Sequence, residues 1–168
     1  MEVEIKFRLE ENVKRKIEEV AEFVCEVRER DLYFNHPCRD FLKTDEALRV
    51  RKSEKVFLTY KGPKIDKETK TREEIEVEIG DFDKSVEILK KLGFKPVAEV
   101  FKVRRIYKLG DATICVDNVK DLGEFVEIEV KSEDVEKAKG VVFKIANEFG
   151  LKNPITKSYL EMLLEKKR

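Results

Sequence analysis

Carboxylate and basic side chains alternate with apolar ones at the start of this chain. Val3 and Ile5 separate Glu2, Glu4 and Lys6 from one another. Successive side chains of a β-strand point to opposite faces, so a strand here would have one apolar and one charged face. Neighbouring carboxylates repel one another unless a cation joins them, and their oxygens suit Mg²⁺ or Mn²⁺. The segment therefore predicts a strand that contributes ligands to a metal site.

The same alternation returns in most of the later segments that favour strands. Arginine and lysine suit phosphate oxygens, and an arginine can bind them through two parallel hydrogen bonds. A site that combines carboxylates, a metal ion, phosphate and arginine is typical of phosphoryl and nucleotidyl transfer. The residues that we place on the charged faces are the basic Arg49, Arg51, Lys61, Lys102 and Arg104 and the acidic Glu74, Glu76, Asp117, Glu127 and Glu129.

Charged residues make up 43% of the chain, so the alternation also fits a sheet whose charged face is simply exposed to water. Two observations favour an enclosed charged face instead. Helices can cover only the apolar faces of the strands, which leaves the charged faces turned toward one another or toward water. The acids and bases also segregate onto different strands, which random surface charge has no reason to do. We therefore favour a barrel whose interior binds a polyanion.

The elements that position these residues follow from the hydrophobic periodicity. Adjacent strands with short connections favour an antiparallel sheet, and about eight strands can close into a barrel. The pattern thus predicts an α+β fold, an eight-stranded antiparallel β-barrel with flanking helices. We expect strands near residues 2–9, 24–34, 46–52, 56–61, 71–79, 99–108, 111–117 and 124–131, and helices at 11–22, 82–92, 133–149 and from about 156.

Length and composition exclude several other classes of protein. A chain of 168 residues suits one domain, which we place at 1–168. Lysine plus arginine and aspartate plus glutamate are 36 each, so no broad basic surface for duplex nucleic acid is expected. Three cysteines without CxxC spacing indicate neither a disulfide framework nor a zinc site. The sequence shows neither a signal peptide nor an apolar run long enough to span a membrane, so we expect a cytoplasmic protein. We expect it to be a monomer or a homodimer.

The Glu2-x-Glu4-x-Lys6 segment resembles the N-terminal ExExK signature of the CYTH superfamily, the triphosphate tunnel metalloenzymes. That superfamily includes class IV adenylyl cyclases, thiamine triphosphatases and inorganic triphosphatases. The signature alone is weak, but further matches follow in order over nearly the whole chain. They are Asp31-x-Tyr33-Phe34, Leu48-Arg49-Val50-Arg51, Thr59-Tyr60-Lys61-Gly62-Pro63, Arg72-x-Glu74, Lys102-x-Arg104, Val116-Asp117, Leu122-Gly123-Glu124-Phe125, Glu127-x-Glu129 and Lys157-Ser158-Tyr159-x-Glu161.

The resemblance implies an eight-stranded tunnel and a role for each charged position. It implies that Lys157 reaches the tunnel from the last helix. We assign catalytic roles to Lys6, Arg104 and Glu76. The resemblance gives triphosphate binding to Lys6, Arg49, Arg51, Lys61, Lys102, Arg104 and Lys157, and metal binding to Glu2, Glu4, Glu74, Asp117, Glu127 and Glu129.

The reaction expected first is that of class IV adenylyl cyclases, ATP to cyclic AMP and pyrophosphate, with Mg²⁺ or Mn²⁺. The Lys61-Gly62-Pro63 and Leu122–Phe125 segments are most similar to that branch. One alternative is a triphosphatase that hydrolyses inorganic triphosphate, thiamine triphosphate or a nucleoside triphosphate. A second is a non-catalytic module that binds polyphosphate or a nucleotide, which would keep the bases without needing every carboxylate. The charged lining serves cyclase and triphosphatase equally, so the residues leave that choice open.

Overall fold

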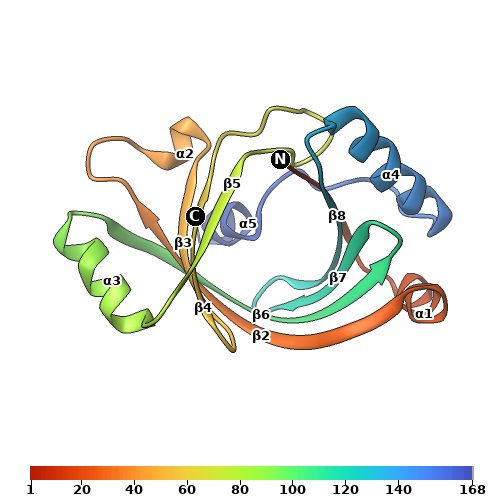
Figure 1. Ribbon diagram of the computed structural model, residues 1–168, viewed down its shortest axis with the longest axis horizontal. Coiled ribbons are helices and arrows are strands. Elements are labelled where there is room, and N and C mark those ends of the chain that lie inside the picture. Colours follow the sequence, from red (N-terminus) through yellow and green to blue (C-terminus); the bar gives the residue numbers. More distant parts are fainter. Residues whose placement is uncertain (168) are drawn as a thin grey trace.

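A single curled sheet forms the body of the protein in a computed structural model that describes residues 1–167 (Figure 1). Arg168, which our predicted domain includes, lies outside the described residues. The strands are β1 (Glu2–Arg8), β2 (Glu22–Asn35), β3 (Ala47–Lys52), β4 (Val56–Lys61), β5 (Glu74–Ile79), β6 (Lys95–Leu109), β7 (Ala112–Val119) and β8 (Gly123–Lys131). The helices are α1 (Glu11–Val20), α2 (Phe41–Thr44), α3 (Phe82–Lys91), α4 (Val135–Glu148) and α5 (Tyr159–Lys166).

The strands lie in the order β1-β8-β7-β6-β2-β3-β4-β5, and every neighbouring pair is antiparallel. The predicted α+β class with eight antiparallel strands is confirmed. Strands β1 and β5 are the two ends of this order. Just before β5, Arg72 meets Glu2 in a bridge of two backbone hydrogen bonds, each 3.2 Å long. The curl therefore closes at this bridge rather than along a full strand pair.

The register of the sheet turns the charged residues toward the concave side. Glu4 lies opposite Glu129 across the β1–β8 pair. Arg104 lies opposite Asp117 across β6–β7, where the tight turn at Gly110 joins the two strands with a φ of 59°. Because directly opposed residues share a face, the register brings side chains of neighbouring strands within reach of one another.

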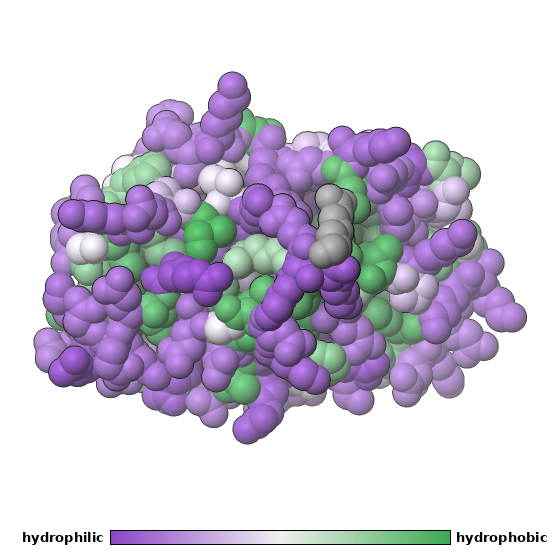
Figure 2. Space-filling view, turned by 180° about the vertical axis from the view of Figure 1, so that it is seen from behind, coloured by the Kyte–Doolittle hydropathy of each residue, from purple (hydrophilic) through white to green (hydrophobic). Residues whose placement is uncertain are grey.

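Two apolar clusters cover the convex side. The first lies under α1 and α4, where Val13, Ile17 and Val142 pack on strand residues such as Ile5 and Ile128. The second lies under α3 and contains Leu32, Phe34, Val50, Phe82 and Val86. Both follow the expected pattern, in which amphipathic helices cover the apolar faces of the strands. Figure 2 shows one outer side of the molecule covered mainly by hydrophilic side chains, with apolar residues in small separate groups.

Helix α5 is different, because it packs inside the curl (Figure 1). Val100, Val119 and Phe125 lie on the concave face and contact Tyr159 and Leu163 of α5. The sequence predicted a last helix but not this position. The concave face is therefore charged over one part and apolar over the part that α5 fills.

The predicted elements match the structure with shifts of a few residues at their ends. Residues 71–73 precede β5 rather than belonging to it, and β6 begins at Lys95 rather than near 99. Helix α5 begins at Tyr159, with Ser158 as its N-cap, rather than near Thr156. The short helix α2 was not predicted. Among residues 1–167, no helix has the length and apolar character that crossing a membrane requires.

Leu163→Ala should destabilise the protein by about 2–4 kcal/mol, because it leaves a cavity where α5 meets the concave face. Leu163 is 6% exposed, whereas Ile88, also on a helix, is 60% exposed. Ile88→Ala should change stability by less than about 0.5 kcal/mol. Urea unfolding of the two variants measures the difference. Equal small effects would mean that α5 is not part of the core.

Candidate active site

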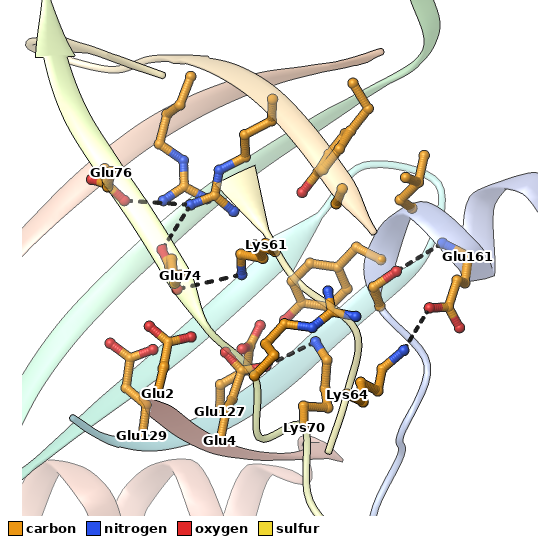
Figure 3. Close-up of a pocket in the computed structure, with 18 of the residues that line it drawn as sticks. Glu2, Glu4, Lys61, Lys64, Lys70, Glu74, Glu76, Glu127, Glu129 and Glu161 are labelled. Carbon is orange, nitrogen blue, oxygen red and sulfur yellow. Dashed lines mark hydrogen bonds and ion pairs between the residues drawn. The ribbon is translucent and has the colours of Figure 1, made fainter. Parts of the chain in front are cut away.

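A cavity of about 630 Å³ lies on the concave side of the sheet. Its charged lining comes from both halves of the curl and from the loop between β4 and β5 (Figure 3). The structure thus brings together most of the residues that the sequence placed on the charged faces. Those that line the cavity are Glu2, Glu4, Arg49, Arg51, Lys61, Glu74, Glu76, Lys102, Arg104, Glu127 and Glu129.

Three predicted site residues do not line this cavity. Lys6 is fully buried, and its Nζ donates a 2.9 Å hydrogen bond to the backbone oxygen of Lys157 and lies 3.8 Å from the centre of the Tyr159 ring. Asp117 is also fully buried and accepts a 2.7 Å hydrogen bond from the Tyr159 hydroxyl. The Lys157 side chain is exposed and pairs with Glu165 at 2.6 Å. Because α5 occupies this part of the interior, these three side chains do not line the cavity, and their roles toward a ligand stay predictions.

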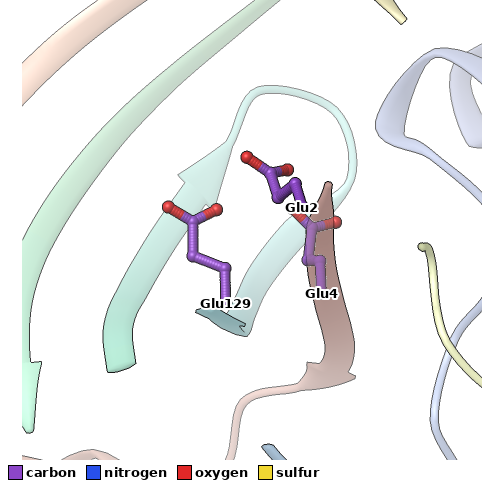
Figure 4. A group of neighbouring side chains, drawn as sticks. All are labelled: Glu2, Glu4 and Glu129. Atoms are coloured by element: carbon purple, nitrogen blue, oxygen red, sulfur yellow. The ribbon is translucent and has the colours of Figure 1, made fainter. Parts of the chain in front are cut away.

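Glu2, Glu4 and Glu129 form a carboxylate trio (Figure 4). One oxygen from each lies within 4.8 Å of the others. Strands β1 and β8 create this proximity, because Glu4 and Glu129 are directly opposed in the register. Like charges in that position repel each other, so the arrangement is unfavourable unless a cation is present.

The electrostatics of the trio show a shortage of positive charge. Burial and, after it, the neighbouring Glu4 together raise the pKa of Glu129 to about 7. Burial also holds the pKa of Glu2 well above its usual range, although Lys61 partly opposes this effect. Three convergent carboxylates suit a hard divalent cation such as Mg²⁺ or Mn²⁺. The trio therefore fits the metal that the sequence predicted, whereas Glu74, Asp117 and Glu127 lie outside it.

Three of the cavity bases are tightly paired with carboxylates of the same interior. Arg51 donates two hydrogen bonds of 2.7 and 2.9 Å to Asp31. Lys102 donates a 2.8 Å bond to the same carboxylate. Arg104 donates two bonds of 2.7 Å to Asp117. Charge-assisted bidentate pairs of this kind fix both partners, so these bases form a rigid wall.

Arg49 and Lys61 are held much more loosely. The Arg49 guanidinium is 3.7 Å from Glu74 and 3.8 Å from Glu76, and Lys61 is 3.8 Å from Glu74 (Figure 3). The buried Nε of Arg49 has no hydrogen-bond partner among the described residues. A buried donor without a partner is costly, so Arg49 keeps an unused hydrogen-bond donor inside the protein.

The pKa values of Glu74 and Glu127 are lowered, in contrast to those of Glu2 and Glu129. Burial opposes the charge on Glu74, but Lys61 and a hydrogen bond from Glu2 lower its pKa to about 2. Burial likewise opposes the charge on Glu127, but a hydrogen bond from Glu4 and the nearby Lys6 hold its pKa well below the usual range. These two carboxylates are already compensated by protein groups, which distinguishes them from Glu2 and Glu129.

Sequence reasoning gave no role to three residues that matter in this cavity. Glu29 and Asp31 supply the negative charge that holds Arg51 and Lys102. Their spacing of two in an extended segment was the available signal. Lys70 lies in the loop between β4 and β5, where no periodicity could indicate its direction. Burial opposes its charge, but Glu4 and Glu127 outweigh that effect and raise the pKa of Lys70.

The family model of the CYTH domain matches residues 1–161. The chain belongs to the CYTH family. This agrees with the resemblance predicted from the ordered motifs, and it accounts for the curled antiparallel sheet around a charged cavity.

Individual CYTH proteins are similar to this chain over nearly its full length. A Methanocaldococcus jannaschii protein, MJ0240, provisionally named an adenylate cyclase, is 43% identical over 173 residues, with 96% of this chain and 98% of that protein covered. The structure of PH1819 from Pyrococcus horikoshii is 48% identical, covers 99% of both chains and has a TM-score of 0.94. A Hippeastrum protein, HpAC1, provisionally named an adenylyl cyclase and described as having a dominant triphosphatase activity, shares the fold with a TM-score of 0.71, 20% identity and coverage of 99% and 96%.

Arg104→Ala should destabilise this CYTH protein by about 3–5 kcal/mol, because it leaves Asp117 buried without its basic partner. The adjacent Arg105 points the other way, pairs with Glu26 at 3.2 Å and has a side chain that is 37% exposed. Arg105→Ala should cost less than about 1 kcal/mol. Urea unfolding measures both effects. A larger loss from Arg105→Ala would invert the assignment of the two faces of β6.

Glu129→Gln should raise the stability of the metal-free protein at pH 8 by about 1–3 kcal/mol, because it removes a carboxylate whose ionisation the folded state disfavours. The variant should also lose most of the rise in melting temperature that Mn²⁺ gives the parent protein. Thermal unfolding in chelator and in Mn²⁺ measures both changes. Glu124→Gln, on the same strand but exposed, is the control. A destabilised variant that kept the full Mn²⁺ effect would contradict a metal site at the trio.

Proposed function

We propose that this CYTH protein binds a triphosphate together with Mg²⁺ or Mn²⁺ in the cavity and cleaves it. One observation supports the proposal above all others. A carboxylate trio that lacks positive charge shares the cavity with two bases, Arg49 and Lys61, that lack close partners. A metal–triphosphate complex supplies a cation for the first group and an anion for the second.

Each group has a distinct task in this proposal. Glu2, Glu4 and Glu129 hold the metal, which when bound withdraws negative charge from the phosphate oxygens. Arg49 and Lys61 bind phosphate oxygens directly and orient the chain of phosphates. The paired bases of the wall, Arg51, Lys102 and Arg104, keep a positive field along the cavity without needing to move. Catalysis then comes mainly from positioning and charge stabilisation.

The first reaction that we propose is cyclisation of ATP. The ribose 3′-oxygen forms a bond to the α-phosphorus, the bond from that phosphorus to the bridging oxygen breaks, and pyrophosphate leaves. The 3′-hydroxyl proton passes to a cavity carboxylate, for which Glu76 is the candidate because its side chain is 34% exposed. The cavity volume suits a ligand larger than a bare triphosphate. Phe41, Leu42 and Leu160 also line it and offer apolar surface to a nucleoside. The name of the Methanocaldococcus relative agrees with this reaction.

The second candidate is hydrolysis of the terminal phosphate. Water forms a bond to the end phosphorus, the bond to its bridging oxygen breaks, and the water proton passes to the same carboxylate. The activity described for the Hippeastrum protein favours this candidate, because that protein shares the fold. A binding module without catalysis is less favoured, since it gains nothing from three crowded carboxylates that disfavour the folded state in the absence of metal.

Product identification separates these reactions. ATP, inorganic triphosphate and thiamine triphosphate are each incubated with Mg²⁺ or Mn²⁺, and the products are separated by anion-exchange chromatography. Cyclic AMP with pyrophosphate identifies a cyclase, and orthophosphate with a diphosphate product identifies a triphosphatase. Tight binding with no product from any substrate would leave only the binding module.

Arg49→Ala should lower kcat/KM for the preferred triphosphate by about 10–150-fold, the equivalent of about 1.5–3 kcal/mol for a charge-assisted contact. Steady-state kinetics with saturating metal measure the effect. Arg39→Ala is the control, because Arg39 pairs with Glu46 at 2.9 Å but does not line the cavity. Its kinetics should stay within about twofold of the parent. Equal losses in both variants would count against a specific phosphate contact at Arg49.

A further inference from the structure

Lys70 is a buried lysine that no strand positions. It lies in the loop between β4 and β5, and its backbone N–H donates a 2.8 Å hydrogen bond to the backbone oxygen of Glu4. Two residues further on, Arg72 forms its bridge with Glu2. The loop is therefore fixed to β1 at Lys70 and again at Arg72, and the Lys70 side chain starts from a defined place at the wall of the cavity.

The Lys70 ammonium contacts the carboxylate trio directly. Its Nζ lies 2.8 Å from Oε2 of Glu4, with side-chain exposures of 9% and 6% (Figure 3). Among the described residues, no other basic group forms an ion pair with Glu2, Glu4 or Glu129. Lys70 is thus the partial counter-ion of the trio in the absence of metal, one positive charge for three carboxylates.

The motif lysine cannot take this place. Lys6 follows Glu4 on the same face of β1, but its Nζ is bound to the backbone oxygen of Lys157 and covered by the ring of Tyr159. The ammonium that enters the cavity next to the trio therefore comes from the loop and not from the strand.

A divalent cation and the Lys70 ammonium compete for the same carboxylate. Both are positive, so a metal ion coordinated by Glu4 would repel an ammonium held 2.8 Å from one of its oxygens. The lysine side chain has four methylene groups joined by rotatable bonds, and its charge is confined to the terminal ammonium group. The ammonium can therefore turn away from Glu4 while the backbone of Lys70 stays in place. Inside the cavity, the anion that enters with the metal offers the ammonium a new partner.

We propose that Lys70 exchanges partners during ligand binding: it neutralises Glu4 in the ligand-free protein and binds phosphate oxygens once metal and triphosphate enter together. The inference rests on the proposed function of the same cavity. Metal alone must displace Lys70 from Glu4 and leave the buried ammonium with Glu127 as its remaining acidic neighbour. Metal with triphosphate displaces it into a contact with phosphate. Lys70 therefore couples the two ligands, so that each binds better in the presence of the other.

Mn²⁺ binding tests this exchange without any measurement of activity. Free Mn²⁺ is followed by electron paramagnetic resonance, with and without an ATP analogue in which methylene groups replace both bridging oxygens of the triphosphate. Lys70→Met removes the charge and keeps an unbranched side chain. Lys70→Arg keeps the charge, and Lys67→Met removes an exposed charge from the same loop. Circular dichroism checks that each variant is folded.

Lys70→Met should bind Mn²⁺ alone at least about 5-fold more tightly than the parent, because the competing ammonium is gone. In the presence of Mn²⁺ it should bind the analogue at least about 5-fold more weakly, because one phosphate contact is gone. Lys70→Arg should leave binding of Mn²⁺ alone weak, as in the parent, and Lys67→Met should change neither constant. The opposite signs of the two shifts are the signature of an exchange.

Other outcomes overturn the inference in distinguishable ways. If Lys70→Met weakens both ligands, Lys70 only supports Glu4 and does not compete with the metal. If it changes neither, Lys70 takes no part in binding, although the proposed function can still hold. If the parent protein binds no Mn²⁺ with or without the analogue, the proposed function fails and the exchange fails with it.

Discussion

Charges that leave water must find partners, and this constraint governs the concave side of the sheet. Asp31 on β2 joins Arg51 of β3 to Lys102 of β6, so that one carboxylate ties three strands together. Asp117 on β7 does the same for Arg104 of β6 and Tyr159 of α5. The ion pairs are therefore part of the architecture, because they decide how closely these strands curl and where α5 is held.

The same constraint marks the functional site as the place where pairing stops. The inward carboxylates of β2 and β7 have basic partners within hydrogen-bond distance, whereas Glu2 and Glu129 have no ion pair among the described residues. A second lysine beside the trio would have balanced its excess of negative charge. Since that excess remains, repulsion among the carboxylates lowers the stability of the fold. A bound cation that relieves this repulsion gains the same free energy as binding free energy. Stability and binding are thus two uses of one set of charges.

The sequence predicts the faces of the strands well, because the period of two is a local property of an extended chain, interrupted here only at two irregularities in the described β2–β6 pair. It assigns Glu4, Arg49 and Arg104 to one surface, and the structure places them around one cavity. The position of α5 could not be predicted in this way. The hydrophobic periodicity of α5 indicates that one side of the helix is apolar. It does not indicate which apolar surface of the sheet that side packs against. The receiving surface includes Val100 and Phe125, two apolar residues on otherwise charged faces.

The three predicted site residues that do not line the cavity all contact that one helix. Lys6, Asp117 and Lys157 have the expected residue types at the expected positions of the family motifs. The Tyr159 ring covers the Lys6 ammonium and its hydroxyl donates a hydrogen bond to Asp117, whereas the exposed Lys157 side chain pairs with Glu165. Lys70 could not be found for the converse reason. A loop residue has no periodicity, and its direction depends on the hydrogen bonds that fix the loop to β1.

Strand β5 has an unpaired edge, so the charges of its glutamates also affect whether another chain can pair with it. An exposed strand edge is a template on which another chain can add a strand. Ile75 and Val77 are 58% and 54% exposed, and such apolar side chains favour association at this edge. Glu74, Glu76 and Glu78 alternate with them on the concave face. Two copies of β5 paired edge to edge would set these carboxylates against each other, and the repulsion opposes the first step of aggregation. The row of acids beside the cavity thus makes edge-to-edge pairing of two copies at β5 less favourable than an apolar row would.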